Sequence, residues 1–130
     1  MVAISTVYSN AHKYLKTEEM QKEFRAYENK YNVSCFVQAQ ALINMAVNGN
    51  ATKDPELFEK LKGFYNYVDE KGNVSPFKLI VDKCLDHLVK TYGKEDVQLK
   101  DGRVVNGTKY LLNAKRSLSN QKTKAEENTL

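Results

Sequence analysis

The amino-acid sequence predicts an all-α domain of five or six helices, in an orthogonal or bundle-like arrangement, with one small β-hairpin (about 97–105) before the last helix. Along most of the 130 residues, apolar side chains recur at intervals of three and four, which is the spacing of one helix face. Both Pro residues follow a residue that caps helices, and an Asp-Gly pair lies between two short apolar runs. We expect residues 1–119 to form a single helical domain and residues 120–130, which are polar and lack periodicity, to form a flexible tail.

The composition is that of an ordinary globular protein. Hydrophobic residues make up 42% and charged residues 28% of the chain, which argues against disorder throughout. No apolar run approaches the roughly 20 residues of a transmembrane helix, and the first residues lack the basic and apolar regions of a secretory leader. The sequence therefore predicts a cytoplasmic protein that does not enter membranes. Cys35 and Cys84 are expected to be reduced thiols in the core, with a disulfide as the alternative.

The helix expected over 76–92 has the clearest sequence signals. Ser75 can cap it and Pro76 fits the first helical position, while Gly93 is expected to end it in the left-handed conformation. Its apolar stripe is wide, which predicts burial against several other helices. The stripe consists of Phe77, Ile80, Val81, Cys84, Leu85, Leu88, Val89 and Tyr92.

Two helices are expected before residue 32. Apolar spacing predicts the first over 2–16, and Thr17 with the two Glu residues after it suits a helix cap followed by an acidic first turn. The pattern allows either a break at Thr17 or one continuous, kinked helix. The second helix, over 18–31, would place on one face Met20, Phe24, Tyr27 and Tyr31.

The next two helices differ in how much of their surface is apolar. The helix over 34–47, which Ser34 can cap, carries almost no charge, so we expect it at the centre of the bundle or at a subunit interface. Asp54 and Pro55 begin the following helix, which is expected to reach about Glu70. Its inward face would consist of Leu57, Phe58, Leu61, Phe64, Tyr65 and Val68.

After Gly93 the pattern changes from helical spacing to two short runs. These runs flank Asp101-Gly102, a pair typical of the two-residue type I′ hairpin turn. An isolated hairpin is marginal in water, so this one is expected to lie on the helical body. Asn106 would then begin the last helix, whose inward residues would be Leu111, Leu112, Ala114 and Leu118.

Charge is unevenly distributed along the chain. The net charge is +4, and residues 100–130 hold 7 Lys and Arg against 3 Asp and Glu, whereas the two signs balance over 1–99. Lys outnumbers Arg by 17 to 3, and Lys contacts phosphates as a point charge without the paired hydrogen bonds that read bases. The sequence therefore predicts a small, non-enzymatic binding or adaptor protein whose basic C-terminal segment contacts nucleic acid (DNA or RNA), largely independently of sequence, or an acidic protein surface. The residues expected at this interface are Lys100, Arg103, Lys109, Lys115, Arg116, Lys122 and Lys124.

Other interpretations of the chain compete with this one. The same basic residues suit a solubilising tail at a helix end. The alternative function is an assembly subunit or modulator that docks through an apolar helical face on a larger protein, or on a second copy of itself, without nucleic acid. An apolar patch exposed on the helix over 34–47 or over 2–16 would favour it. The order helix 55–70, turn, helix 76–92, hairpin is also that of a winged helix-turn-helix, although Asp82 and Asp86 would meet the DNA phosphates.

Catalytic and metal-binding patterns are weak, so no catalytic site, cofactor or metal is expected. Cys84 and His87 are close enough on one helix for a nucleophile and its base, but Cys84 belongs to the core stripe, and structural zinc needs four ligands. Paired carboxylates on single helix faces have Lys residues four positions away, which predicts surface ion pairs. These pairs are Asp82 and Asp86, with Lys78 and Lys90, and Glu56 and Glu59, with Lys60 beside Glu56.

Overall fold

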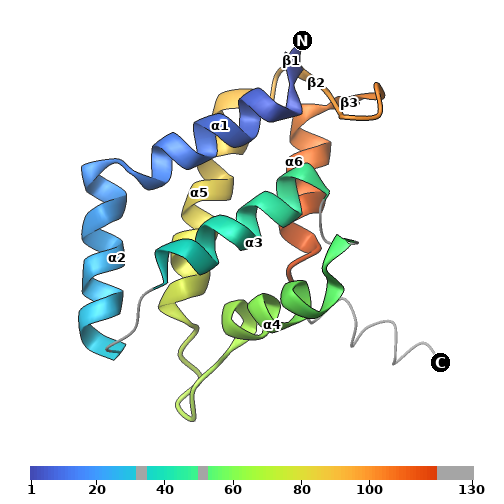
Figure 1. Ribbon diagram of the computed structural model, residues 1–130. Helices are drawn as coiled ribbons and strands as arrows, with labels where there is room; N and C mark the ends of the chain where they lie inside the picture. Colours follow the sequence, from blue (N-terminus) through green and yellow to red (C-terminus); the bar gives the residue numbers. More distant parts are fainter. Residues whose placement is uncertain (32–34, 50–52, 120–130) are drawn as a thin grey trace, which may run out of the picture.

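The computed structural model describes residues 1–31, 35–49 and 53–119, and the expected tail at 120–130 lies outside this part of the chain (Figure 1). The described residues form an all-α domain with a small sheet whose hairpin precedes the last helix, which confirms the predicted fold class. The helices are α1 (Ile4–Leu15), α2 (Glu18–Tyr31), α3 (Phe36–Asn48), α4 (Pro55–Asn66), α5 (Pro76–Tyr92) and α6 (Gly107–Arg116). The strands are β1 (Val2–Ala3), β2 (Asp96–Gln98) and β3 (Val104–Asn106).

Helix α5 lies at the centre of the molecule and contacts each of the other five helices (Figure 1). The Ser75 hydroxyl oxygen accepts a hydrogen bond from the Phe77 N–H, so the predicted cap is confirmed. The predicted stripe is buried along the whole helix, with Val89 half-buried at its edge. The wide stripe in the sequence therefore has a direct cause, since five neighbours cover this helix.

The prediction of a left-handed end at Gly93 is wrong. Gly93 has a φ of −61°, in the right-handed region. Glycine is needed there for a different reason, because a Cβ atom would lie 2.5 Å from the Val89 carbonyl oxygen and 2.7 Å from Thr108 Oγ1. Thr108 Oγ1 donates a 2.7 Å hydrogen bond to the Gly93 carbonyl, which fastens the start of α6 to the end of α5.

The first two helices are separate. Thr17 caps α2 as expected, since its Oγ1 accepts a 3.4 Å hydrogen bond from the Met20 N–H. The first helix is shorter than predicted, because Val2 and Ala3 form strand β1. β1 pairs in parallel with β2, with Val2 opposite Val97, and β2 pairs antiparallel with β3. Val2 and Ala3 thus add a third strand to the hairpin. Two apolar residues in the sequence do not predict such a long-range pairing.

Helix α3 is central, as predicted, and packs against α1, α4, α5 and α6. It begins at Phe36 after Cys35, and the expected cap, Ser34, lies outside the described residues. Its inward positions are fully buried, whereas Val37 at its first turn is 69% exposed. The fully buried residues of α3 are Ala39, Leu42, Ile43 and Val47.

Helix α4 ends at Asn66, four residues before the predicted end at Glu70. The connection 67–75 folds back on itself, with a bridge between Val68 and Val74 and a left-handed Gly72 (φ 84°). The Asp69 carboxylate accepts hydrogen bonds from the backbone N–H groups at 71 and 73. These bonds compete with the backbone hydrogen bonds that would continue the helix. Val68, which was predicted to face inward on the helix, therefore lies beyond its end and is 51% exposed. Phe64, near the end of α4 and also predicted to face inward, is 44% exposed.

No helix in the described part of the chain is long and apolar enough to span a bilayer.

Candidate nucleic-acid interface

Three of the predicted interface residues, Lys100, Arg103 and Lys109, lie at one end of the molecule, where the sheet meets the start of α6 (Figure 1). Lys115 and Arg116 lie in the last turn of α6, toward α4. Lys100 and Arg103 are exposed at the tip of the hairpin, and Lys109 and Arg116 are exposed on α6. Lys115 is half-buried. The two remaining predicted residues, Lys122 and Lys124, lie outside the described residues.

The hairpin tip is a three-residue loop, so the predicted type I′ turn is wrong. The Leu99 N–H donates to the Arg103 carbonyl, and the Gly102 N–H donates to the Leu99 carbonyl. These bonds place Lys100 and Asp101 at the centre of the turn and Gly102, with a φ of 92°, in the bulge position that follows it. Asp101 stabilises this form because its Oδ1 accepts a 3.0 Å hydrogen bond from the Arg103 N–H.

Arg103 is partly neutralised by the same aspartate. Its Nε lies 2.7 Å from Asp101 Oδ2, and both side chains are exposed. Hydrogen bonds from the Arg103 backbone N–H and side chain lower the pKa of the Asp101 carboxyl. An exposed pair of this kind is weak, so Arg103 can exchange this partner for a phosphate.

Helix α6 begins at Gly107, after the cap that the sequence predicted. Asn106 Oδ1 accepts a 3.0 Å hydrogen bond from the Lys109 N–H. Lys109, Asn113 and Arg116 follow one another at helical spacing along one exposed face, and an Arg116 guanidinium N–H donates to Asn113 Oδ1 at 3.2 Å. The sequence correctly grouped Lys109 and Arg116 on one face of this helix.

Lys115 does not belong to that face. Its Nζ lies 2.8 Å from Asp86 Oδ1 on α5, so its charge is directed toward the helical body and is compensated there. Leu112, which was predicted to face inward, is instead 38% exposed, whereas Leu111, Ala114 and Leu118 are buried as expected. The buried face of α6 is therefore narrower than predicted, and Leu112 lies outside it.

A groove of about 470 Å³ runs between β3 and α6 and brings the two basic segments together. Arg103 and Lys109 line it, although they come from the hairpin and the helix respectively. Tyr110 is half-buried in the same groove, and its hydroxyl donates a 2.5 Å hydrogen bond to the Val47 carbonyl of α3. The remaining lining residues are Leu99, Val105, Asn106 and Asn113.

The groove combines cations at its rim with an apolar floor. The Tyr110 ring is held in place by its hydroxyl, and burial raises the pKa of that hydroxyl, so it stays a neutral donor. The nearby Arg103 charge lowers the pKa of the Tyr110 hydroxyl, and the Asp101 charge raises it. We call the exposed cations of the hairpin and of α6 (Lys100, Arg103, Lys109 and Arg116) the basic surface.

The Cys84 and His87 pair does not have the geometry of a nucleophile and a base. Cys84 is fully buried, its Sγ faces the Ala11 carbonyl oxygen at 3.9 Å, and burial raises its pKa to about 12. His87 stacks on Tyr14 with ring centroids 4.0 Å apart. Both cysteines are free and buried, as predicted; burial also raises the pKa of Cys35 to about 12.

The carboxylate pairs form ion pairs, but partly with other lysines than predicted. Asp82 pairs with Lys78 at 2.5 Å, as expected, and also accepts a hydrogen bond from the Tyr65 hydroxyl. Asp86 pairs with Lys115 rather than with its helical neighbour Lys90. Glu59 pairs with Lys62 at 3.4 Å. Among the described residues no cluster of three or more metal-ligating side chains occurs.

The winged helix-turn-helix alternative does not fit the packing of α5. A recognition helix must leave a wide face free to enter a groove of DNA, whereas α5 contacts the other five helices and leaves a narrow exposed stripe. That stripe includes Leu79, Asp86 and Lys90, and Asp86 would repel the DNA phosphates. The hairpin that would be the wing is paired instead with β1.

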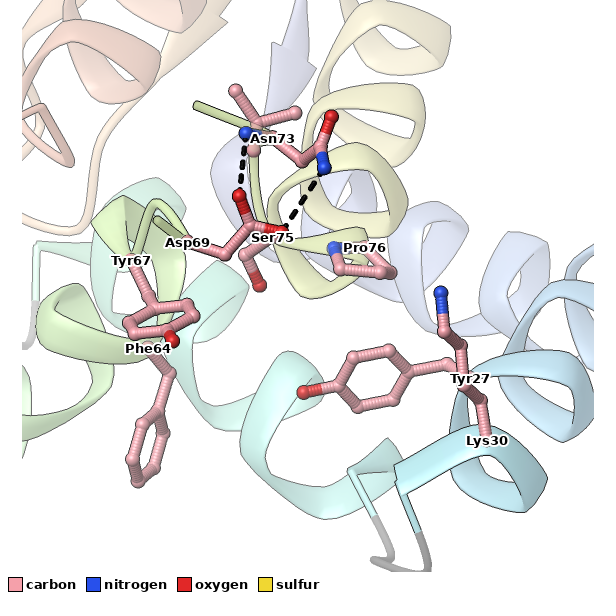
Figure 2. Close-up of a pocket in the computed structure, with 9 residues that line it drawn as sticks. Tyr27, Lys30, Phe64, Tyr67, Asp69, Asn73, Ser75 and Pro76 are labelled. Atoms are coloured by element: carbon pink, nitrogen blue, oxygen red, sulfur yellow. Dashed lines mark hydrogen bonds between the residues drawn. The ribbon is translucent and has the colours of Figure 1, made fainter. Parts of the chain in front are cut away.

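Sequence reasoning missed a second cavity, at the opposite end of the molecule from the sheet (Figures 1 and 2). It has a volume of about 290 Å³ and lies between the C-terminal part of α2, the end of α4 and the 67–75 connection. The exposed apolar surface gathers here rather than on α1 or along α3, although the sequence pointed to those two helices. We call it the aromatic pocket; its lining residues are Tyr27, Lys30, Phe64, Tyr67, Asp69, Asn73, Val74, Ser75 and Pro76.

No family model, curated protein or solved structure matches this chain.

Proposed function

We propose that this protein is a small, non-enzymatic binding protein that holds single-stranded nucleic acid on the basic surface, largely independently of sequence. The observation that carries the proposal is that Arg103 and Lys109 line one groove, together with the ring of Tyr110. Proteins that bind single strands without sequence preference combine these two features, a cationic groove for the backbone and an aromatic ring for a base.

Charge is the part of the proposal that the sequence already supported. Four cations are exposed on adjoining segments: Lys100, Arg103, Lys109 and Arg116. Among the described residues, Arg103 is the one of these four that forms an ion pair with a carboxylate. Each phosphate that such a cation neutralises releases counterions, which makes the affinity fall with salt. A single strand suits the site better than a duplex, because Asp101 and Asp86 border the basic surface and would repel a wider array of phosphates.

The test is binding of fluorescently labelled single-stranded DNA and RNA to the full chain over a series of salt concentrations, measured by anisotropy. The double variant Arg103→Gln/Lys109→Gln should bind more weakly, with a salt slope smaller by about 1.4, the value for two lost phosphate contacts to a single strand. The matched control is Lys22→Gln/Lys60→Gln, which removes two exposed positive charges from α2 and α4. It should bind almost as tightly as the natural chain.

Two results would overturn the proposal. One is no binding of either oligonucleotide at low salt, and the other is an equal loss in both double variants, since that would show a general effect of net charge. A labelled poly-glutamate peptide is included in the same series. Binding of that peptide without oligonucleotide binding would assign the basic surface to an acidic protein partner instead. A chain ending at Ser119 measures separately what Lys122 and Lys124 add.

A further inference from the structure

The aromatic pocket is the site of the second inference, which does not depend on the basic surface. Its walls expose large apolar side chains that the fold does not cover: Phe64 is 44%, Tyr67 62% and Val74 45% exposed. Figure 2 shows Tyr27 reaching from α2 across the opening toward Phe64 and Tyr67. Apolar side chains gathered around a concave site, rather than scattered singly, indicate an interaction surface.

The residues that form the walls of the pocket are held in place by other contacts. The Phe64 ring packs edge-on against Phe77, a core residue, with centroids 6.4 Å apart. On the opposite side the Asp69 carboxylate accepts hydrogen bonds from Asn73, through its backbone N–H at 2.9 Å and its side-chain amide at 3.0 Å (Figure 2). The pocket is therefore preformed, and a ligand would not have to order it.

The charges around the pocket compensate each other. The hydrogen bonds from Asn73, with the nearby Lys30 charge, lower the pKa of the Asp69 carboxyl, so the carboxylate stays ionised. Its oxygens are already occupied by the backbone of the same turn. Lys30 and Asp69 contribute one charge of each sign to the lining, so the pocket has no net charge that would select a cation or an anion, and it suits an uncharged ligand.

Two hydroxyl groups of the pocket have hydrogens that no described residue accepts, so they can donate to a ligand. Ser75 is 5% exposed, and its Oγ accepts from the Phe77 N–H, while no described residue accepts the hydrogen of the same hydroxyl. The Tyr67 hydroxyl likewise has no hydrogen-bond partner among the described residues. The matching ligand is apolar, uncharged and rich in acceptors.

We propose that the aromatic pocket binds a proline-rich segment of a partner protein in the polyproline II conformation. A proline residue has an apolar ring and a carbonyl acceptor but no N–H donor, which complements a pocket of aromatic walls and hydroxyl donors. The polyproline II helix is formed before binding and recurs as the ligand of aromatic-lined grooves. The partner is another protein, because this chain has 2 Pro residues and both begin helices.

The two ligand sites lie at opposite ends of the helical body, so both can be occupied at once (Figure 1). An oligonucleotide on the basic surface and a proline-rich segment in the aromatic pocket would then be joined by one small domain. This arrangement is that of an adaptor, and it also gives the assembly interpretation of the sequence a definite surface.

The test is binding of a fluorescein-labelled decaproline peptide to the full chain, measured by anisotropy. The Tyr67→Ala variant should lose at least tenfold in affinity, because it removes one wall of the pocket. The Tyr67→Phe variant keeps the wall and loses the hydroxyl, so its affinity should fall between about two- and tenfold. Since Tyr67 is exposed, both variants should keep the circular dichroism spectrum and melting temperature of the natural chain.

The controls separate this site from a general effect of exposed apolar residues. Leu112→Ala, at the other end of the molecule, should bind decaproline as the natural chain does, and a glycine-serine peptide of equal length should bind at least tenfold more weakly. Failure of decaproline to bind, equal binding by Tyr67→Ala, or equal binding of the glycine-serine peptide would each overturn the proposal. Tyr67→Ala should still bind oligonucleotides, so failure here is distinguishable from failure of the basic surface.

Discussion

The two ends of this molecule expose different chemistry and are held together in different ways. At the basic surface, backbone packs closely on backbone, since Gly107 lies against the carbonyl oxygens of Tyr92 and Glu95. At the aromatic pocket, one carboxylate, that of Asp69, accepts the hydrogen bonds that form a turn, and residues 70–74 of that turn are exposed. The basic surface therefore lies beside closely packed backbone, where the end of α5 meets the start of α6. The aromatic pocket, in contrast, is formed in part by a connection between two helices.

The largest expected loss of stability comes from adding one methyl group where the start of α6 packs against the end of α5. In Gly107→Ala the new Cβ would lie 2.2 Å from the Tyr92 carbonyl oxygen and 2.6 Å from that of Glu95. Backbone atoms cannot move aside cheaply, so we expect unfolding in denaturant to show a loss of about 3 kcal/mol. The control, Gly63→Ala, has no atom within 4 Å of the new Cβ and lies within α4. It should gain about 1 kcal/mol, and equal behaviour of the two variants would contradict the close packing.

The next effect compares one buried tyrosine hydroxyl near each end. The Tyr65 hydroxyl donates to the Asp82 carboxylate, whereas the Tyr110 hydroxyl donates to the neutral Val47 carbonyl. Hydrogen bonds to charged groups are stronger, so Tyr65→Phe should cost about 2 kcal/mol and Tyr110→Phe about 1 kcal/mol in denaturant unfolding. A larger loss of stability for Tyr110→Phe would contradict this order. It would mean that the packing of α6 against α3 depends on the Tyr110 hydroxyl by more than the energy of one neutral hydrogen bond.

A smaller, local effect is expected at the two exposed aspartate turns. Asp69→Ala removes the acceptor for the N–H groups of Lys71 and Asn73, so amide exchange there should quicken while α5 stays protected. Since the Asp69 pKa is lowered from 3.8 in the folded protein, its contribution is present above pH 3.8 and is lost as pH falls further. Asp101→Ala is the matched control at the other end and should affect Arg103 rather than the 67–75 connection. Quicker exchange throughout the chain would contradict a local role.

The smallest effect is a pH dependence that belongs to neither end. Burial against Tyr14 lowers the pKa of His87 from 6.5, which outweighs the opposite effect of Glu19; Lys90 adds to the decrease. The unfolded chain therefore binds this proton more readily, so the contribution is complete above pH 6.5 and declines as pH falls below it. Melting temperature should decrease slightly from pH 7.5 to 5.5, and His87→Gln should remove part of that decrease. An unchanged slope in the variant would rule out His87 as its source.

Sequence patterns predicted best those features that depend on neighbours in the chain. Caps at Ser75, Asp54 and Asn106 are all present, because a cap needs one side chain and the N–H groups two or three residues later. The stripe of α5 is buried because helical spacing alone decides which residues share a face. The local patterns failed at Gly93, where a Cβ atom would meet both the Val89 carbonyl oxygen and, from the next helix, Thr108 Oγ1.

The candidate sites divide in the same way. The basic surface could be found because an excess of charge is visible in composition, although composition could not show that Lys115 would pair with Asp86 on another helix. The aromatic pocket could not be found, because Phe64 and Val68 both fit the helical spacing of a buried face, although the helix ends between them and both are exposed. The available signal was the Asp69 to Asn73 segment with its glycine, which has the residue types of a turn.

The sequence by itself determined that this chain forms a helical domain, where most of its helices begin, and that its C-terminal third is basic. Each of these features follows from spacing, capping or composition, which act over a few residues. Tertiary structure decided which cations remain exposed, which apolar residues remain uncovered, and that β1 completes the sheet. Those outcomes depend on how α6 is rotated against α5 and where α4 ends, and both are set by contacts between residues far apart in the chain.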